Sequence, residues 1–354
     1  MDRSPWLQRR LQGITGTDAA ALLGLHPFRT AIEVWAEKVG LLRPRDIGDV
    51  ERVKWGSILE APIIREVVAA TRRQRARARE WPEIVSADVE AHEHVWFEGG
   101  RPRSRTKYIL ASKRIPSAMV TPDFMFREWR PALVIGEQVA LEGPGLGEIK
   151  TTSAYNSKRW HGSPPIEVEI QVQHGLLVAD RPQWATAAVF IGGQALRIYD
   201  LPLHRPFLNV LEDRIGHFMD YHVARMIQPD AVGTEAERDA LRRLYPEDDG
   251  TAKTLLSSWL DSALRIAVLK EQASRIDSEL KVRETQLRAA IGRSSYVVID
   301  GSGVCLSYKA DARGVRTLRR LKDNAVVAPS LPLRCEPGTA IAGPSGNTAP
   351  QETR

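Results

Sequence analysis

Thr121-Pro122-Asp123 and Gly147-Glu148-Ile149-Lys150 are the most informative segments of this sequence, and Glu148 lies twenty-five residues after Asp123. The second segment predicts a β-strand. Side chains alternate between the two faces of a strand, so Glu148 and Lys150 share one face and Ile149 takes the other. Two carboxylates and an ammonium that converge at a sheet edge must share a proton or bind a cation. Hard oxygen ligands of this kind suit Mg²⁺ or Mn²⁺.

A divalent ion in this position would lower the pKa of a bound water and stabilise charge on a phosphodiester oxygen. Lys150 would then orient the attacking water. On spacing alone, a surface strand with solvated charges explains the pattern better than a metal site does. The choice between the two interpretations therefore depends on what accompanies the two segments.

Two further segments supply polar side chains for the same expected site. Glu60 lies on an expected helix whose opposite face is aliphatic. Gln171 and Gln173 lie on another expected helix. Residues two positions apart on a helix point about 200° away from each other, so only one of the two glutamines can face the site. Gly175, four residues after Gln171, leaves that face open, which favours Gln171. Gln173 and His174 are interpreted as helix surface or as supporting residues.

The order of the expected elements indicates an α/β (α+β) fold. Helices come first, followed by short strands between residues 84 and 198, with one helix over 166–179 between the last of them. This order predicts a mixed central sheet flanked by helices. A long charged helix over 251–291 and a short β segment over 296–308 predict a C-terminal helical extension. The apolar spacing of that helix is too irregular for a sustained coiled coil.

The same elements divide the chain into four expected regions. A core covers 1–228, an acidic linker covers 229–250, and a helical arm with a short β and basic segment covers 251–323. The Pro-, Gly- and Ser-rich residues 324–354 are expected to form a flexible tail.

Composition excludes several classes of protein. Lys and Arg number 50 against 44 Asp and Glu, and the resulting charge of +6 permits a polyanionic partner without requiring one. Two cysteines, Cys305 and Cys335, exclude a disulfide framework and four-Cys zinc or iron–sulfur sites. Residues 1–6 are polar and no run reaches the roughly 18 apolar residues of a membrane helix. We expect a soluble, cytoplasmic protein that does not bind membranes.

Six segments in a fixed order resemble the YqaJ-type phage recombinases, which are the lambda-exonuclease-like branch of the PD-(D/E)xK nucleases. The resemblance covers roughly residues 8–220 and implies a restriction-endonuclease-like core. The arm and the basic segment over 308–320 are similar to an extension common in this branch. The matching segments are 13–20, 55–60, 121–123, 147–152, 171–174, and 191–193 leading into 196–199.

The resemblance implies a role for each matching residue at the acidic site. Asp123 and Glu148 would be metal ligands, and the main-chain carbonyl of Ile149 would complete the shell. Lys150 would position or activate water. Glu60 would serve a second metal ion or its waters.

Three other matching residues would act on the nucleophile or the DNA. Gln171 would support the nucleophile side, and Arg10 and Thr17 would hold a DNA phosphate, such as the 5′-phosphate of the shortened strand. Thr17 is explained equally well as a helix N-cap, and it keeps the hydroxyl of the serine usual in the family. Phe124 follows Asp123 where the family usually has Gly, so its ring either narrows the site or packs under the sheet.

The activity that the resemblance implies is a Mg²⁺-dependent exonuclease, with Mn²⁺ as a substitute cation, that digests one strand of double-stranded DNA ends from 5′ to 3′. The 3′ single strand would serve a single-strand annealing protein in phage-type homologous recombination, within a bacterial or phage-infected cell. Ring-shaped trimers, typical of the branch, imply a homo-oligomer. Two alternatives stay open: an endonuclease or repair nuclease of the same superfamily, and a non-catalytic DNA-end-binding scaffold on the same fold.

Basic and aromatic residues allow two interpretations each. The arginines between 72 and 79 and the basic residues between 101 and 114 line a duplex channel or form solvated faces. Trp35, Trp55, Trp160 and Trp184 are interpreted as packing residues, and Trp160 is also considered as a wedge between bases.

Overall fold

The computed structural model describes residues 5–45, 47, 50–98, 101–128, 143–299 and 305–320. The chain divides into two compact units, Met1–Gly250 and Thr251–Arg354. The first unit contains every candidate site residue named above, and the second contains a long helix and a small sheet.

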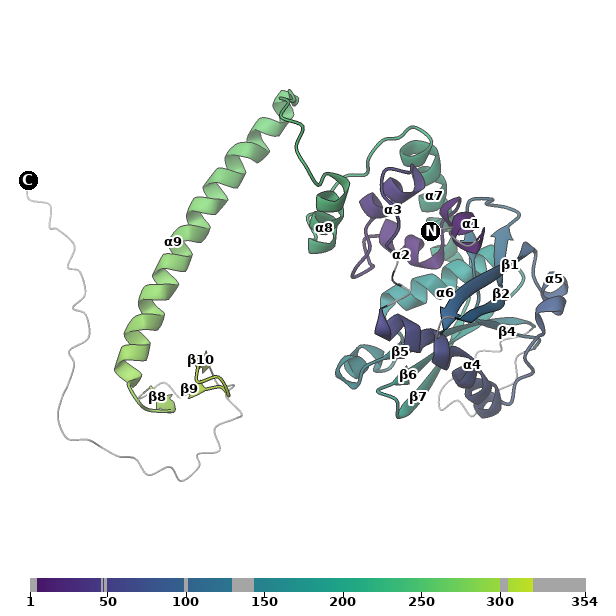
Figure 1. Ribbon diagram of the computed structural model, residues 1–354, viewed down its shortest axis with the longest axis horizontal. Coiled ribbons are helices and arrows are strands. Elements are labelled where there is room, and N and C mark those ends of the chain that lie inside the picture. The colour runs from purple at the N-terminus through teal and green to yellow at the C-terminus, as the bar shows by residue number, and fades with distance from the viewer. Residues whose placement is uncertain are drawn as a thin grey trace, which may run out of the picture. The chain divides into compact units, whose positions relative to one another are not determined.

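A four-stranded mixed sheet forms the centre of the first unit (Figure 1). β5 and β6 run parallel, whereas the pairs β4–β5 and β6–β7 are antiparallel. Parallel neighbours need a crossover connection, which α6 (Ile166–Ala179) provides. The predicted mixed sheet flanked by helices is confirmed. In spatial order the strands are β4 (Phe124–Phe126), β5 (Gly145–Thr152), β6 (Trp184–Ile191) and β7 (Ala195–Pro202).

Two helices cover opposite faces of this sheet. Ile149 of β5 packs in an apolar cluster with Ile63 and Val67 of α4 (Glu51–Thr71). Its neighbour Glu148 bonds to Gln171 of α6. Because successive residues of a strand face opposite sides, α4 and α6 enclose the sheet between them.

Phe124 belongs to the apolar cluster under α4 and is fully buried. A Cβ on Gly147 would lie 2.2 Å from the Phe124 ring, and one on Gly145 would lie 2.4 Å from the Trp184 ring. The two glycines of β5 therefore make room for two aromatic rings on the face that carries Ile149. The open question about Phe124 is answered by this contact: its ring packs under the sheet and does not narrow the acidic site.

A second, antiparallel sheet and further helices complete the first unit. The sheet consists of β1 (Ala87–Glu98), β2 (Arg101–Ser112) and β3 (Met119–Val120). The helical elements are α1 (Pro5–Leu11), α2 (Gly16–Leu22), α3 (Ala31–Lys38), η1 (Ala78–Glu80), α5 (Trp81–Ile84), η2 (Ala154–Trp160), α7 (Arg205–His217), η3 (Phe218–Val223) and α8 (Glu235–Leu244).

Residues 229–250, predicted as a linker, contain α8 and pack on the core. Arg243 of α8 donates a hydrogen bond to Glu33 Oε1 of α3 at 2.5 Å, and Ala240 is buried. Glu237 is buried as well, because its carboxylate accepts hydrogen bonds from the main-chain N–H groups of residues 232–234. The acidic stretch predicted as a linker thus includes a helix-capping carboxylate.

The arginine run between residues 72 and 79 directly follows α4. Arg73 is only 2% exposed, forms an ion pair with Asp200, and donates to Thr186 Oγ1 at 2.9 Å. Its guanidinium lies 4.9 Å from the centre of the Trp184 ring. Arg73 is therefore a core residue, and a channel role for the whole run is wrong. In the second basic cluster, Lys113 and Arg114 form surface ion pairs with Asp88 and Glu212.

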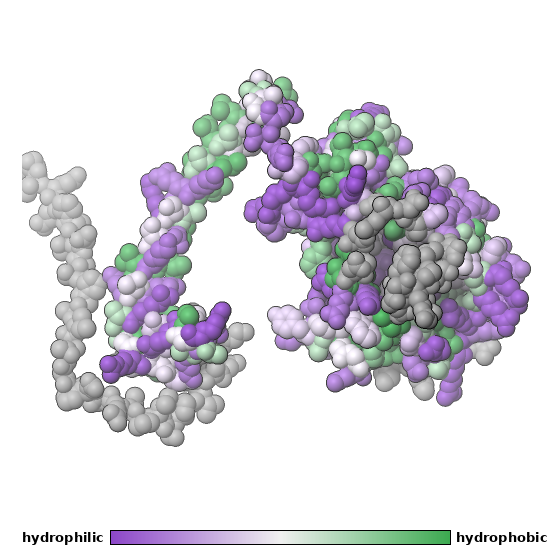
Figure 2. All heavy atoms as spheres, viewed as in Figure 1, coloured by the Kyte–Doolittle hydropathy of each residue, from purple (hydrophilic) through white to green (hydrophobic). Residues whose placement is uncertain are grey.

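The second unit contains α9 (Leu260–Ile291) and an antiparallel sheet of β8 (Tyr296–Val298), β9 (Cys305–Ala310) and β10 (Arg316–Arg320). The helix predicted over 251–291 starts later, after the 3₁₀ turn η4 (Ser257–Trp259). Figure 2 shows hydrophilic residues interspersed with hydrophobic ones along α9. Four ion pairs between residues four apart support this helix from residue 271 onward: Glu271–Arg275, Asp277–Lys281, Glu279–Arg283 and Glu284–Arg288.

The predicted tail, 324–354, lies outside the described residues. Within the described part of the chain, no helix combines the length and the apolarity that crossing a membrane requires.

Candidate active site

Asp123 is held opposite β5 by two main-chain contacts at the start of β4. Its N–H donates to the Gly147 carbonyl at 3.2 Å, and its Oδ2 accepts from the Ile149 N–H at 2.7 Å. Because Asp123 has these partners on both sides of Glu148, the antiparallel pairing of β4 and β5 brings the two carboxylates together. The predicted meeting of the two motifs at a sheet edge is present in the structure.

Glu148 and Lys150 lie on the same face of β5, as the alternation of side chains predicts. Lys150 Nζ contacts Glu148 Oε1 at 2.5 Å, and Gln171 Nε2 of α6 donates to the same oxygen at 2.7 Å. Glu148 is 8% exposed, and Ile149 is buried on the other face. The preference for Gln171 over Gln173 as the glutamine that faces the site agrees with this geometry.

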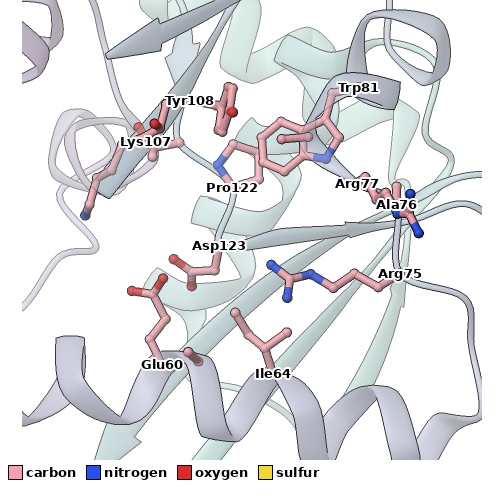
Figure 3. A pocket seen from close by; sticks show the side chains of 14 residues that line it. Glu60, Ile64, Arg75, Ala76, Arg77, Trp81, Lys107, Tyr108, Pro122 and Asp123 are labelled. Carbon is pink, nitrogen blue, oxygen red and sulfur yellow. The ribbon is translucent and has the colours of Figure 1, made fainter. Parts of the chain in front are cut away.

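Glu60 approaches the site from α4. Glu60 and Asp123 line one cavity, and Figure 3 shows their carboxyl groups pointing toward one another. The structure therefore gathers three acidic side chains from three elements: the end of the β3–β4 connection, β5 and α4.

The charges of this cluster affect one another strongly. Burial, followed by the carboxylates of Glu148 and Glu60, raises the pKa of Asp123 well above its usual range. Burial lowers the pKa of Lys150, but the Glu148 and Asp123 carboxylates outweigh burial and leave that pKa above its usual value. Lys150 is therefore a cation at neutral pH. The raised pKa of Asp123 means that ionising it beside Glu148 and Glu60 is costly, so a cation bound among the three acids would be stabilised.

The oxygen atoms of the cluster fit a hard divalent cation. The hydrogen bonds described above occupy Oε1 of Glu148 and Oδ2 of Asp123. Within the described residues, the second oxygen of each of these two carboxylates accepts none. These oxygens and the Ile149 carbonyl form the kind of donor set that Mg²⁺ and Mn²⁺ prefer. Across the described residues, no three His, Cys, Asp or Glu side chains are already arranged closely enough to hold a metal ion. A bound ion would therefore draw the acidic side chains closer together.

Arg10 of α1 lies near the acids and has an unsatisfied donor. Its Nε is buried without a hydrogen-bond partner in the described part of the chain. The guanidinium lies 4.6 Å from the centre of the Trp6 ring. Burial lowers the pKa of Arg10, and the carboxylates of Asp18 and Glu148 act in the opposite direction. A buried donor beside a cation site is suited to a phosphate oxygen.

Thr17 lies in the first turn of α2 and is half-buried. It is not the helix N-cap, so that interpretation was wrong: Thr15 is the cap, and its N–H donates to Asp18 Oδ2 at 3.0 Å. The Thr15-x-x-Asp18 spacing is the signal that would have located the cap. The hydroxyl of Thr17 therefore has no capping task.

Asp18 is a residue whose importance the sequence interpretation missed. It is buried, and it pairs with Arg29 at 2.8 Å and with Lys38 at 3.2 Å. Lys38 Nζ also donates to the Arg10 carbonyl at 3.0 Å. Burial raises the pKa of Asp18, but Lys38, Arg29 and the Thr15 N–H outweigh burial and hold the pKa far below its usual value. The network ties α1, α2 and α3 together around Arg10.

Gly16, and not Gly175, makes room for Gln171. A Cβ on Gly16 would lie 2.6 Å from Gln171 Cγ and 3.1 Å from its Cα, whereas Gly175 faces Leu146 and Val120. The helices α2 and α6 therefore meet at Gly16, where the side chain of Gln171 begins. The reason given above for choosing Gln171 was wrong, although the residue itself faces the site.

Gly16→Ala is expected to destabilise the fold by about 1–3 kcal/mol, because the added methyl group overpacks the α2–α6 contact. It should also weaken the Gln171–Glu148 hydrogen bond. Urea unfolding measures the loss of stability. Gly216→Ala is the matched control, because a Cβ on Gly216 meets nothing within 4 Å. Equal stability of the two variants would contradict the tight contact.

Gln173 and His174 of α6 are both enclosed by other parts of the protein. Gln173 Nε2 donates to the Pro202 carbonyl at 2.8 Å, and its Oε1 accepts from the His204 N–H at 2.9 Å. His174 is fully buried. The supporting role proposed for Gln173 agrees with these bonds, and neither residue lies on the helix surface.

His174 is expected to make stability depend on pH. Burial lowers its pKa from 6.5 to about 4. The unfolded chain therefore binds more protons between these values, and the folded state loses stability as the pH falls. From pH 7 to pH 5 the loss from this residue is about 2 kcal/mol. Urea unfolding at both pH values should show a shallower pH dependence in His174→Gln than in the wild type. An identical dependence would remove His174 as the cause.

Trp160 is a packing residue, as predicted, whereas Trp55 is not. Trp160 is buried beside Tyr199, with ring centres 6.1 Å apart, and its carbonyl accepts from Arg197 Nη1 at 2.9 Å. These contacts support packing and not a base wedge. Trp55, expected to pack, is 52% exposed on α4.

Comparisons with known proteins agree with the motifs. Residues 5–182, about half of the chain, match the model of the YqaJ-like viral recombinase domain. The uncharacterized protein YqaJ of Bacillus subtilis (strain 168) is 26% identical over 309 residues, which are 86% of this chain and 83% of that protein.

Similar solved structures include the alkaline exonuclease LHK-Exo from Laribacter hongkongensis, with a TM-score of 0.41 and 14% identity over 67% of this chain and 97% of that one. Its complex with dAMP has a TM-score of 0.40 and 15% identity, over 67% of this chain and 95% of that one. The resemblance inferred from the ordered motifs is confirmed by the family match, and the chain belongs to the family of YqaJ-like viral recombinase domains.

Proposed function

We propose that this chain is a metal-dependent exonuclease of the lambda-exonuclease type, which digests one strand of double-stranded DNA ends from 5′ to 3′. The observation that carries the proposal is the meeting of Asp123, Glu148 and Lys150 at the β4–β5 edge, with Lys150 Nζ 2.5 Å from Glu148 Oε1. Membership of the YqaJ-like family supports the same assignment. A decayed, purely DNA-binding relative would be expected to lack one of the three side chains.

Asp123, Glu148 and the Ile149 carbonyl would hold a divalent ion, Mg²⁺ or in its place Mn²⁺. Glu60 would hold a second ion or its waters. Such ions supply an activated water and stabilise the charge that develops on the phosphodiester. The raised pKa of Asp123, and the oxygens of Asp123 and Glu148 that accept no hydrogen bond within the described residues, support this assignment.

The other residues would position the reactants. Lys150 is held by Glu148 and would orient the attacking water, while the amide of Gln171 keeps Glu148 in place on the nucleophile side. Arg10, with its unsatisfied Nε, and Thr17 would hold a phosphate of the shortened strand, such as its 5′-phosphate. Together these contacts would fix the end of the strand relative to the water.

The product would be a 3′ single strand for phage-type homologous recombination. We propose a single-strand annealing protein as its user, a trimer as the working oligomer, and the cytoplasm of a bacterial or phage-infected cell as the location. These proposals rest on the family alone.

The test is digestion of a linear duplex, with and without a 5′-phosphate and with and without Mg²⁺, with the products resolved by strand. We expect loss of the 5′-ended strand, faster when it carries a phosphate, and no loss without a divalent ion. Cleavage of a circular duplex at a similar rate would replace the proposal with an endonuclease. Binding to intact ends without any digestion would replace it with a scaffold.

A further inference from the structure

A cavity of about 360 Å³ opens beside the acidic site, on the side where Glu60 and Asp123 face one another (Figure 3). Its opposite wall is formed by residues 75–78 and Trp81, and β2 contributes Lys107 and Tyr108. The cavity therefore has carboxylates at one end and cationic side chains along its wall. Its volume is within the range of pockets that hold small ligands, about 300–1,000 Å³.

Arg75 and Arg77 are presented to this cavity by a fixed main chain. The Ala76 N–H donates to the Met125 carbonyl at 2.8 Å, and the Arg127 N–H donates to the Gln74 carbonyl at 2.9 Å. The segment therefore extends the edge of β4, the strand that begins next to Asp123. Figure 3 shows the side chain of Arg75 extending toward Asp123.

The two arginines differ from Arg73, whose charge is neutralised within the core. Both are exposed, and neither guanidinium forms a hydrogen bond or an ion pair within the described residues. Cations that line a cavity and have no ion-pair partner among the described residues are available to bind an anionic ligand. A phosphate group is the anion that Arg binds most specifically, through paired N–H donors.

Trp81 gives a second, independent indication of a ligand. Its side chain lines the cavity and is 5% exposed, and its Nε1 is buried without a hydrogen-bond partner in the described part of the chain. A buried N–H donor that has no acceptor costs stability, and this one, on a side chain that lines the cavity, could donate to an anion bound there. The ring is fixed by Tyr108, at a distance of 5.2 Å between ring centres.

We propose that this cavity is a phosphate-binding subsite for the DNA phosphate next to the one that is cut, with Arg75 and Arg77 as its cations and Trp81 Nε1 as a further donor. The inference rests on the proposed function, because the acidic end of the cavity is the proposed cleavage site. The carboxylates alone would repel the DNA backbone. The arginines offset that repulsion and hold the strand against the acids.

The test compares Arg75→Ala and Arg75→Lys with the control Arg79→Ala, which removes an exposed arginine of the same run that does not line the cavity. We expect Arg75→Ala to raise KM for a linear duplex about tenfold, as the loss of one charge-assisted phosphate contact implies, with kcat within about threefold. Arg75→Lys should restore only part of the loss, because lysine keeps the charge but not the paired N–H donors. Trp81→Phe removes the N–H together with part of the buried ring, and it should raise KM about fivefold in a variant that urea unfolding shows to be folded.

Binding of the duplex can also be measured without divalent metal. A purely structural role for Arg75 would not change how this binding depends on salt concentration. The slope of log Kd against log salt concentration should fall in Arg75→Ala by about 0.7–0.9, the value for one lost phosphate contact, and should stay unchanged in Arg79→Ala. Weaker inhibition of the variant by inorganic phosphate would show that the subsite also binds the free ion.

The outcomes separate the two proposals. If the wild type digests DNA and Arg75→Ala matches Arg79→Ala in both KM and salt slope, the subsite is wrong and the nuclease stands. If the wild type neither digests nor binds DNA under any metal condition, the proposed function itself is wrong.

Discussion

Lys150→Ala is expected to reduce the rate of DNA cleavage by about 10²- to 10⁴-fold, the range typical for removing a group that orients or transfers a proton. Binding of duplex ends should change little, because an interaction made only in the transition state can be lost without weakening ground-state binding. The geometry strengthens this expectation. Lys150 contacts Glu148 at 2.5 Å and lies on the face of β5 where the acidic cluster forms. Single-turnover digestion and an independent binding assay measure the two quantities.

Two observations control for indirect effects of this change. Lys113→Ala removes the same charge from an exposed position, where the lysine lies 3.8 Å from Asp88, and should retain cleavage within about twofold. Urea unfolding should show that the Lys150 variant is folded. A folded variant that still turns over at the wild-type rate would remove Lys150 from the proposed role.

The local features of the site follow from short patterns in the sequence. Alternation along β5 is enough to place Glu148 and Lys150 on one face, and the 3.6-residue period of α6 is enough to separate Gln171 from Gln173. Both predictions need only the geometry of one element. They agree with the structure because neighbouring side chains on a single strand or helix have few alternatives.

Features that depend on contacts between distant segments could not be predicted in this way. Arg73 looked like one member of a basic run, yet its ion pair with Asp200 joins residues 127 positions apart. The contact of Gly16 with Gln171 was missed for the same reason, whereas the capping box of Thr234 and Glu237 is local and its spacing could have located it. A side chain's partner in the folded chain decides whether a charge is solvated or buried, and composition does not contain that partner.

Glu148→Gln is expected to weaken metal binding and cleavage together. The change keeps the size of the side chain and an oxygen that can accept from Gln171, but it removes the charge that a hard divalent cation requires. The carboxylate of Glu148 is also one cause of the raised pKa of Asp123, so that pKa should fall in the variant. We expect the Mg²⁺ concentration for half-maximal cleavage to rise at least tenfold, a loss of about 1.4 kcal/mol of binding free energy.

Thermal unfolding in a Mg²⁺ titration measures the expected loss of metal binding without relying on activity. A ligand that binds only the folded state stabilises it by about 2.7 kcal/mol at one hundred times its dissociation constant, so weaker binding shifts the titration to higher concentrations. Glu169→Gln is the matched control, because it makes the same change on α6 at a residue outside the acidic cluster. If Glu148→Gln responds to Mg²⁺ as the wild type does, in both unfolding and cleavage, Glu148 is not a ligand of the ion. Asp123, Glu60 and the Ile149 carbonyl would then have to supply the ligands without Glu148.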